Sequence, residues 1–269
     1  MSAVGRRVVR LEDRRLLRGL GHFVDDVHRP GQLWMRVLRS PLAHARLGSV
    51  RTEAALAIPG VETVLTGEDL EQTSPIPIRT RSEHELDAFL QPVLARDRVR
   101  YVGEPVAVVL AEDAYLAEDA AELIEVEYEE LPVALDASEA IGTDAARLRD
   151  GCNNEAATLV MGYGDVEAAF SDAARVIEVD VKIGRHSGVP LETRGLVADY
   201  DAGSDHLVIW GATKVPHFNR RVLSQMLGMP LSRISMRKSD AGGGFGVRGE
   251  FYSEDFLVPY LARKMRRPV

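Results

Sequence analysis

The chain has 269 residues, of which 45% are hydrophobic and 28% charged, a composition typical of a globular protein with room for two domains of ordinary size. Its formal net charge of −8 argues against nonspecific binding to nucleic acid or to an anionic membrane surface. No apolar run approaches the length of a membrane span, and the Arg-rich residues 1–18 lack the apolar core of a secretory signal. We therefore expect a cytoplasmic protein.

The cysteine and histidine content argues against a metal centre built from side chains. Cys152 is the only cysteine, which excludes an internal disulfide and a cysteine-rich metal or iron–sulfur site within this chain. The seven histidines are scattered, and no pair has metal-ligand spacing on one helix face. We expect no metal ion held by direct side-chain ligation.

Residues 1–139 predict an α+β domain of short strands with one amphipathic helix. The expected strands span residues 23–27, 33–39, 61–65, 98–102, 105–110 and 125–129. Residues 105–110 are apolar throughout and should be buried on both faces, whereas residues 125–129 alternate with glutamates and predict an edge strand with one wet face. Between them, residues 113–123 carry an apolar stripe at helical spacing. This order of strand, helix and strand resembles a βαβ unit.

A polar stretch containing Gly and Asn predicts a linker over residues 140–157, and residues 158–269 predict a second α+β region. Its expected strands span residues 175–183, 196–200, 207–210 and 233–237. Its expected helices span residues 165–172, 215–227 and 253–264. In the first of these helices Val166, Ala169 and Phe170 should point inward. In the second, Pro216 suits the first turn and Gly228 should end the helix.

The most distinctive local feature is residues 240–248, Asp-Ala-Gly-Gly-Gly-Phe-Gly-Val-Arg. A backbone with so few Cβ atoms can adopt positive φ and let a ligand press against main-chain N–H groups, which together can form an anion-binding nest. The spacing matches neither the dinucleotide fingerprint nor a Walker loop. A flexible glycine hinge is the alternative. The strand before the loop and the helix after it are nevertheless a common arrangement for holding phosphate at a helix N-terminus.

Six motifs in series resemble the large, molybdenum-binding subunit of the xanthine dehydrogenase, aldehyde oxidase and aerobic carbon monoxide dehydrogenase family. The motifs are residues 18–26 (RGLGHFVDD), 39–45 (RSPLAHA), 99–107 (VRYVGEPVA), 126–132 (VEYEELP), 190–195 (PLETRG) and 242–246 (GGGFG). They occur in order and cover nearly the whole chain. The resemblance implies an α/β hammerhead domain followed by the start of a molybdopterin-binding α+β domain.

The same resemblance implies a molybdenum–molybdopterin cofactor, in its cytosine dinucleotide form, and oxidative hydroxylation of an aldehyde or N-heteroaromatic substrate with water as the oxygen source. Electrons would pass to a small iron–sulfur subunit carrying 2Fe-2S clusters and to a medium subunit carrying FAD. The family continues well beyond residue 269 and has its catalytic base there, so the catalytic residue of this chain is unknown. The chain is thus expected to be either a fragment or one piece of a split large subunit, whose helix over residues 253–265 would end against nothing. We expect either a partner chain that supplies the C-terminal remainder of the large subunit, or an incomplete and weakly stable product.

The resemblance also implies which residues lie at the cofactor. They are Lys214, Gly242, Gly243, Gly244, Phe245, Gly246 and Arg248. The glycine backbone would lie beside the metal's ligands, because any Cβ there would push the cofactor away, and Phe245 would contact the cofactor. Lys214 stands where many family members have a glutamine that hydrogen-bonds an oxygen on the metal. A lysine can also donate, and it adds a positive charge; a surface lysine at a helix start is the alternative.

Three further charged residues have competing interpretations. Arg248 would either reach a phosphate or acidic group or be a surface cation paired with Glu250 or Glu254. Glu250 is the candidate for substrate contact, although it lies one residue later than the glutamate of purine-oxidising members, which weakens the case for a purine. Glu192 lies in an apolar segment, where a buried acid needs a partner, so we expect structural pairing with the nearby Arg194.

Two other functions remain open. The chain would be a non-catalytic scaffold or assembly piece of such a complex if it keeps the fold but cannot bind cofactor alone. A generic nucleotide-binding protein is less favoured, because neither of the common phosphate-binding spacings is present.

Overall fold

β5 (Pro105–Ala111) is the centre of the first region, because all seven of its residues are buried. The computed structural model, which describes residues 4–79, 86–184, 186–211 and 213–269, places it between β1 (Trp34–Arg39) and β3 (Val61–Thr66) in an antiparallel sheet. The helix α3 (Ala114–Glu122) packs on β1 and β5. Its N-terminus is capped by the Asp113 carboxylate, which accepts from two backbone N–H groups at 2.8 and 3.2 Å. The predicted burial of β5 on both faces is confirmed.

A second antiparallel sheet of the first region has the order β4 (Arg98–Val99), β2 (Ala45–Arg51) and β6 (Glu125–Glu130). β6 lies at the edge and exposes its glutamates, as predicted. The predicted βαβ unit is wrong, because β5 and β6 belong to different sheets and α3 connects the two. β4 is shorter than the predicted strand because the chain turns over residues 101–104. There the Glu104 N–H donates to the Tyr101 carbonyl at 3.2 Å, and Gly103 has φ of 93°.

The second region is built on a three-stranded sheet of β7 (Leu196–Asp201), β8 (His206–Gly211) and β9 (Ile234–Lys238). β7 pairs antiparallel with β8, whereas β8 pairs parallel with β9 through the crossover helix α6 (Pro216–Leu227). Pro216 begins this helix and the left-handed Gly228, with φ of 60°, ends it, as predicted.

The helix α7 (Ser253–Met265) packs against β7 and β8 and joins the two regions. One apolar cluster runs through both regions, since it contains Leu110 of β5, Leu207 of β8 and Phe256 of α7. The remaining helices are α1 (Asp13–Leu16), η1 (Val24–Asp26), α2 (Glu53–Leu56), η2 (Glu68–Leu70), η3 (Asp87–Phe89), α4 (Ala137–Ala140), α5 (Val166–Ser171) and η4 (Leu231–Arg233). In the described ranges, no helix is both long and apolar enough to cross a membrane.

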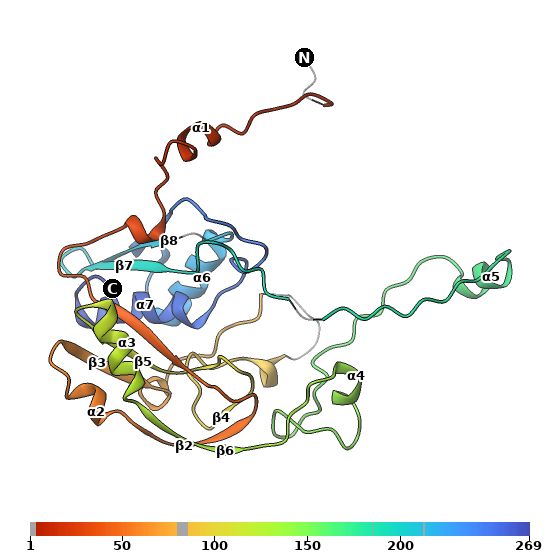
Figure 1. The fold of residues 1–269 in the computed structure, drawn as a ribbon, viewed down its shortest axis with the longest axis horizontal. Coiled ribbons are helices and arrows are strands. Elements are labelled where there is room, and N and C mark those ends of the chain that lie inside the picture. The colour runs from red at the N-terminus through yellow and green to blue at the C-terminus, as the bar shows by residue number, and fades with distance from the viewer. Residues whose placement is uncertain (1–3, 80–85, 185, 212) are drawn as a thin grey trace.

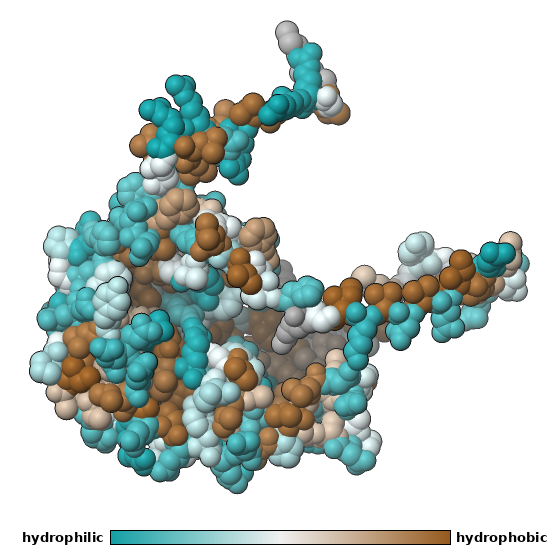
Figure 2. Space-filling view, in the orientation of Figure 1, coloured by the Kyte–Doolittle hydropathy of each residue, from teal (hydrophilic) through white to brown (hydrophobic). Residues whose placement is uncertain are grey.

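Two segments lead away from this packed body in Figure 1, the N-terminal segment with α1 and a long arm with α5 at its tip. Apolar side chains follow the arm in Figure 2. The prediction that Val166 and Phe170 point inward is therefore wrong, because both are exposed on α5. Residues 175–183, predicted as a strand, run along the same arm and belong to no sheet in the described chain. Apolar residues at every second position show which face of a segment is apolar, but they do not show whether a neighbouring strand is present.

Two further expectations are corrected. Residues 23–27 do not form a strand, because the Asp26 carboxylate accepts from the Phe23 N–H at 2.8 Å and closes the 3-10 helix η1. The expectation that helix α7 ends without a neighbour is wrong, because the residues that follow it pair with other parts of the chain. After the helix, Val269 exchanges two backbone hydrogen bonds with Ala198 of β7, at 2.8 and 2.9 Å. The Pro268 carbonyl accepts from the Leu33 N–H at 2.7 Å, so this segment extends the edge of the sheet.

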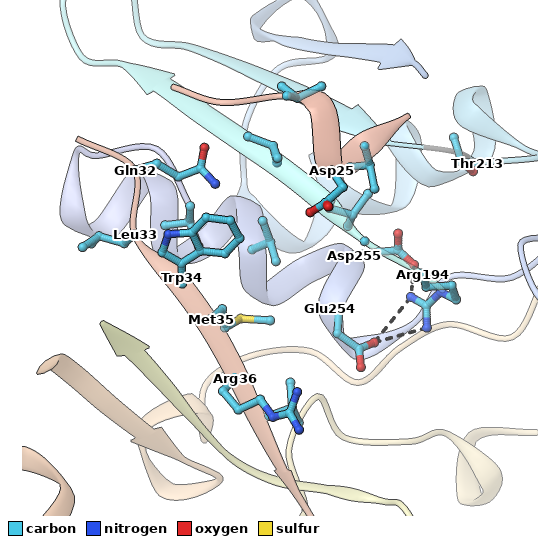
Figure 3. Close-up of a pocket in the computed structure, with 18 of the residues that line it drawn as sticks. Asp25, Gln32, Leu33, Trp34, Met35, Arg36, Arg194, Thr213, Glu254 and Asp255 are labelled. Carbon is cyan, nitrogen blue, oxygen red and sulfur yellow. Dashed lines mark hydrogen bonds and ion pairs between the residues drawn. The ribbon is translucent and has the colours of Figure 1, made fainter. Parts of the chain in front are cut away.

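An ion-pair network connects β1 to the first turn of α7, and Figure 3 shows the part of it that joins Arg194 to Glu254 and Asp255. Arg39 at the end of β1 pairs with Glu254. Arg194 lies 3.4 Å from the carboxylates of both Glu254 and Asp255, and its guanidinium carbon lies 3.6 Å from the ring centroid of Tyr252. Burial raises the pKa of Asp255 to about 6, although Arg194 and the Tyr252 N–H oppose that rise.

We predict that Asp255 makes the fold less stable as pH rises. Its folded pKa of about 6 lies above its ordinary value of 3.8, so folding favours the protonated acid. The stabilisation that folding gains from the protonated Asp255 is fully present below about pH 4 and is lost as pH rises through about 6. Between about pH 4 and about pH 7 this amounts to at most about 3 kcal/mol in the free energy of unfolding.

Urea unfolding of wild type and Asp255→Asn over this pH range measures the effect. The difference in free energy of unfolding between the two should shift in favour of the variant as pH rises. Asp119→Asn, on the exposed face of α3, makes the same exchange without burial and is the matched control. Parallel pH profiles for wild type and Asp255→Asn would contradict the prediction.

Candidate functional site

The glycine loop, residues 240–248, lies between β9 and α7, which confirms the predicted order of strand, loop and helix. Its backbone has positive φ at Gly243 (110°), Phe245 (43°) and Gly246 (96°). Phe245 carries a Cβ and therefore adopts this conformation at a cost, and it is 77% exposed. A strained residue that also exposes an aromatic ring is a candidate for a functional position.

Glu192 and Arg248 form a buried ion pair, the loop clamp, that fixes the conformation of the glycine loop. Arg248 Nη2 donates to Glu192 Oε2 at 2.8 Å, and the two side chains are only 5% and 14% exposed. The same carboxylate oxygen accepts from the Gly242 N–H at 2.8 Å. Arg248 Nε donates to the Gly243 carbonyl at 2.7 Å. Each end of the clamp therefore holds both its partner and the loop backbone.

The clamp corrects two expectations about charge pairing. Arg248 is not a surface cation paired with Glu250 or Glu254, because it is buried against Glu192. Glu192 does have a structural ion pair, but its partner is Arg248, whereas Arg194 pairs with the first turn of α7. Glu192 and Arg248 are distant in sequence, so the arginine that is nearest to Glu192 along the chain is not the one that pairs with it.

The glycines of the loop differ in what a side chain would meet. A Cβ at Gly242 would lie 2.4 Å from Glu192 Cβ, and one at Gly243 would lie 3.0 Å from Pro190 Cβ. A Cβ at Gly244 would meet nothing within 4 Å, and its φ lies outside the left-handed range. Gly242 and Gly243 are thus required by packing within the chain, while Gly244 presents bare backbone to open space.

The loop also presents backbone donors. In the part of the chain that the structure describes, the N–H groups of residues 243–246 donate to no protein acceptor. The N–H groups that follow, those of Val247 and Gly249, bond to the Gly244 and Gly246 carbonyls at 2.9 and 3.1 Å and tighten the bend. Successive unpaired N–H groups in such a bend attract anionic or oxygen-bearing groups. Within the described ranges no three His, Cys, Asp or Glu residues gather as a metal-binding cluster, so the loop offers main chain in place of side-chain ligands.

Lys214 lies beside this loop. It directly precedes Val215, the N-cap residue of α6, and its N–H donates to the Arg248 carbonyl at 3.1 Å. Its Cδ lies 3.8 Å from the position of a Cβ at Gly249. The structure therefore brings Lys214 next to the end of the glycine loop. Glu250, by contrast, forms an ion pair with Arg79 at 2.7 Å.

Asp240 is a residue of the site to which sequence reasoning gave no role. Arg15 donates to both of its carboxylate oxygens at 2.6 Å, and the His22 N–H donates to Oδ2 at 2.7 Å. The Arg15 guanidinium lowers the pKa of Asp240 well below its ordinary range. The Asp240 N–H in turn donates to the His22 carbonyl at 2.8 Å. The segment around residues 15–22 is thereby tied to the start of the glycine loop.

A cavity of about 720 Å³ lies between β1 of the first region and β7 and α7 of the second. Figure 3 shows Trp34 and Met35 on one side of it and Arg194, Glu254 and Asp255 on the other. Arg248 of the loop clamp also lines it, so the cavity adjoins the glycine loop. Its wall includes Asn219, which is buried and whose Oδ1 has no partner among the described residues.

Comparison with known proteins matches both regions of the chain. Residues 18–132 match the family model of the aldehyde oxidase and xanthine dehydrogenase a/b hammerhead domain. Residues 149–269 match that of the molybdopterin cofactor-binding domain.

Individual relatives match over nearly all of this chain but only part of their own length. Subunit gamma of the 6-hydroxypseudooxynicotine dehydrogenase complex of Paenarthrobacter nicotinovorans is 43% identical over 99% of this chain and 34% of its own. The nicotine 6-hydroxylase large subunit of the same organism is 38% identical over 100% of this chain and 33% of its own. The carbon monoxide dehydrogenase large chain of Hydrogenophaga pseudoflava is 35% identical over 96% of this chain and 33% of its own.

A solved structure likewise matches the whole of this chain over about a third of its own length. Quinoline 2-oxidoreductase from Pseudomonas putida 86 superposes with a TM-score of 0.89 at 38% identity, over 100% of this chain and 34% of that one. The chain thus spans about a third of the length of the relatives it matches. It belongs to the family of molybdopterin-binding large subunits that includes those of xanthine dehydrogenase, aldehyde oxidase and carbon monoxide dehydrogenase.

Proposed function

We propose that this chain forms one side of the cofactor site of a molybdenum hydroxylase, an enzyme that hydroxylates a carbon of an N-heteroaromatic or aldehyde substrate with oxygen from water. The observation that carries the proposal is the bare backbone at Gly244. A Cβ there would face open space, and the N–H groups of residues 243–246 beside it have no acceptor among the described residues. A molybdenum–molybdopterin cofactor, when bound, supplies the two-electron oxidation that protein side chains do not provide. The bare backbone gives such a group the close approach that it needs.

The residues present fit an anionic, oxygen-rich group. Glu192 and Arg248 neutralise each other within the clamp, so the loop surface gains no negative charge from the carboxylate. The N–H groups of residues 243–246 would donate to the oxygen atoms of the group, and the Lys214 ammonium would add positive charge beside them. Phe245 would pack against the group and exclude water from that side.

The substrate class that we favour is an N-heteroaromatic compound other than a purine. Two of the relatives described above are named for nicotine and quinoline, which contain nitrogen heteroaromatic rings. Glu250, the residue near the position of the glutamate of purine-oxidising members, is engaged by Arg79 at 2.7 Å. An aldehyde substrate remains the alternative within the same chemistry.

The partners follow from the length of the relatives. This chain spans about a third of them, so we propose that the rest of the large subunit, on a separate chain or as a part missing from the sequence given, completes the cofactor site. We further propose a small subunit with 2Fe-2S clusters and a medium subunit with FAD as electron acceptors, the cytosine dinucleotide form of the cofactor, and a cytoplasmic location.

Metal analysis of the complex tests this function. The chain is co-expressed with the polypeptide that supplies the rest of the large subunit and with the iron–sulfur and FAD subunits, under cofactor-sufficient conditions. Stoichiometric molybdenum and reduction of an electron acceptor by an N-heteroaromatic substrate are the expected results. A stable complex without molybdenum would instead identify a scaffold or assembly piece.

We predict that Gly244→Val removes the cofactor but not the fold. A Cβ at this position would have no described atom within 4 Å, so the free energy of unfolding should change by less than about 0.5 kcal/mol. The side chain would occupy the space that we assign to the cofactor, and the molybdenum content of the complex should fall by at least about tenfold. Inductively coupled plasma mass spectrometry and urea unfolding measure the two effects.

Gly203→Val, in the turn at the opposite end of β8, is the matched control and should retain full molybdenum. Gly243→Val is a poorer choice, because φ of 110° and Pro190 at 3.0 Å would strain the loop itself. Full metal occupancy in the Gly244→Val complex would show that the loop does not face the cofactor.

We predict that Lys214→Gln retains the cofactor and changes turnover. Glutamine keeps a hydrogen-bond donor but removes the charge, and a hydrogen bond to a charged group contributes about 1.5–3 kcal/mol. The value of kcat/KM should therefore change by about tenfold or more, while molybdenum content stays at the wild-type level. Lys264→Gln, on the exposed face of α7, is the control. Kinetics identical to wild type on every accepted substrate would remove Lys214 from the site.

A further inference from the structure

Residues 188–192 form a backing segment that packs along the glycine loop. At one end of the contact, a Cβ at Gly188 would lie 3.0 Å from Phe245 Cβ. Two residues further along the segment, Pro190 Cβ lies 3.0 Å from the position of a Cβ at Gly243. The backing segment and the loop clamp at its other end therefore determine together where the loop lies.

Gly188 is required for space and not for its backbone conformation. Its φ lies outside the left-handed range, but a Cβ there would also lie 3.2 Å from the Phe245 carbonyl oxygen and 3.2 Å from Val247 Cγ1. Contacts this short force the neighbouring atoms to move by a few tenths of an ångström. Because two of the three contacts are with Phe245, and one of these is with its backbone, a side chain at Gly188 would displace Phe245 itself.

Two strained residues meet at Gly188. Val189 follows it with φ of 36°, and Phe245 packs against it with φ of 43°. Val189 is β-branched and precedes a proline, and both properties disfavour this conformation. In the described ranges the other non-glycine residues with positive φ are Asp205, in the β7–β8 turn, and Arg266, the C-cap of α7, where this conformation is common. Strain that no turn or cap explains is typical of functional sites.

The Phe245 ring borders the backbone N–H groups of the loop. A Cβ at Gly243 would lie 3.1 Å from Phe245 Cε2, so the edge of the ring lies beside Gly243. The Gly243 N–H is the first of the four that have no acceptor in the described chain. Because the ring is also 77% exposed, a group bound at these N–H groups has the ring as a neighbour.

We propose that Gly188 is a positioning residue that acts through Phe245 and sets the size of the substrate ring that the site accepts. This inference rests on the proposed function, because that function places the substrate beside the glycine loop. Without a side chain at Gly188, Phe245 keeps its strained backbone and its ring forms one wall of the site. A Cβ at Gly188 would push Phe245 away from the backing segment, towards its exposed side, and narrow the space for the substrate.

Gly188→Ala in the complete enzyme complex tests the effect on selectivity. The probes are pyridine, with one ring, and quinoline, with two fused rings, and the measured quantity is the ratio of kcat/KM for quinoline to that for pyridine. The ratio should fall by roughly tenfold, because a displacement of a fraction of an ångström at the reacting groups has effects of that order. Molybdenum content should stay at the wild-type level.

Gly48→Ala is the matched control. A Cβ at Gly48, in β2 of the first region, would lie 3.1 Å from Glu127 Cβ, so the substitution has a similar steric cost at a position away from the loop. It should leave the selectivity ratio within about twofold of wild type.

A double-mutant cycle tests whether Gly188 acts through the ring. Phe245→Ala removes the ring but keeps the Cβ, and it should raise the selectivity ratio because one wall of the site is lost. Gly188→Ala added to Phe245→Ala should change the ratio by less than about twofold. Val247→Ala added to Gly188→Ala removes the contact with Val247 Cγ1 and should not restore the ratio.

Fluorine NMR of the complex gives a measurement that does not need turnover. Phenylalanine is replaced by 4-fluorophenylalanine, and the resonance that disappears in Phe245→Ala is assigned to Phe245. Gly188→Ala should shift this resonance, because the ring moves, whereas Gly48→Ala should leave it in place.

Three outcomes would overturn the proposal. They are a wild-type selectivity ratio in Gly188→Ala, an equal effect of Gly188→Ala with and without the Phe245 ring, and an unmoved Phe245 resonance. Restoration of the ratio by Val247→Ala would also contradict it, because the effect would then pass through Val247.

Failure of the proposed function has a different signature. A complex that holds no molybdenum and oxidises neither probe would refute that function, and with it the role in selectivity, even if the Phe245 resonance moves in Gly188→Ala. A molybdenum-loaded, active complex in which Gly188→Ala changes neither the resonance nor the ratio would refute the role of Gly188 alone.

Discussion

The buried ion pair between Glu192 and Arg248 is the interaction on which the candidate site depends. A backbone with four glycines in five residues loses more conformational freedom on folding than any other, so it does not hold one shape unaided. The clamp supplies the missing restraint through hydrogen bonds to Gly242 and Gly243. Each charge would be strongly unfavourable there without the other, which makes the pair and the loop conformation interdependent.

Both regions of the chain contribute to holding this loop. The segment around residues 15–22 fixes its first residue through Arg15 and Asp240, and β1 reaches the helix after it through Arg39 and Glu254. The β8–α6 connection reaches its last residue through Lys214. A rigid site built from several separate elements holds a ligand more precisely than an isolated loop does. The hammerhead region is therefore part of the architecture of the site and does not merely precede it.

The sequence predicted elements whose signals are local. β5 was evident from its apolar run, and α6 from Pro216 and Gly228, because caps and burial act on neighbouring residues. The loop was predicted as the site, since its composition is unusual in itself. The partners of Glu192 and Arg248 were not, because the two are 56 residues apart in sequence and only the fold brings them together. The sequence predicts strands over residues 23–27 and 175–183. It does not show the hydrogen bond from the Phe23 N–H to Asp26 that closes η1, and alternation over residues 175–183 cannot reveal whether a neighbouring strand exists.

For the same reason, the sequence alone does not show which physical requirement each glycine of the loop meets. Composition shows that Cβ atoms are absent from the loop but not what stands in their place. In the structure, Glu192 fills the space at Gly242 and Pro190 the space at Gly243, whereas a Cβ at Gly244 would meet no described atom within 4 Å. Two different physical requirements, tight packing of chain against chain and open backbone towards a ligand, thus produce one continuous glycine motif. A substitution in the motif reports on cofactor binding only where the second requirement holds, which makes Gly244 the informative position.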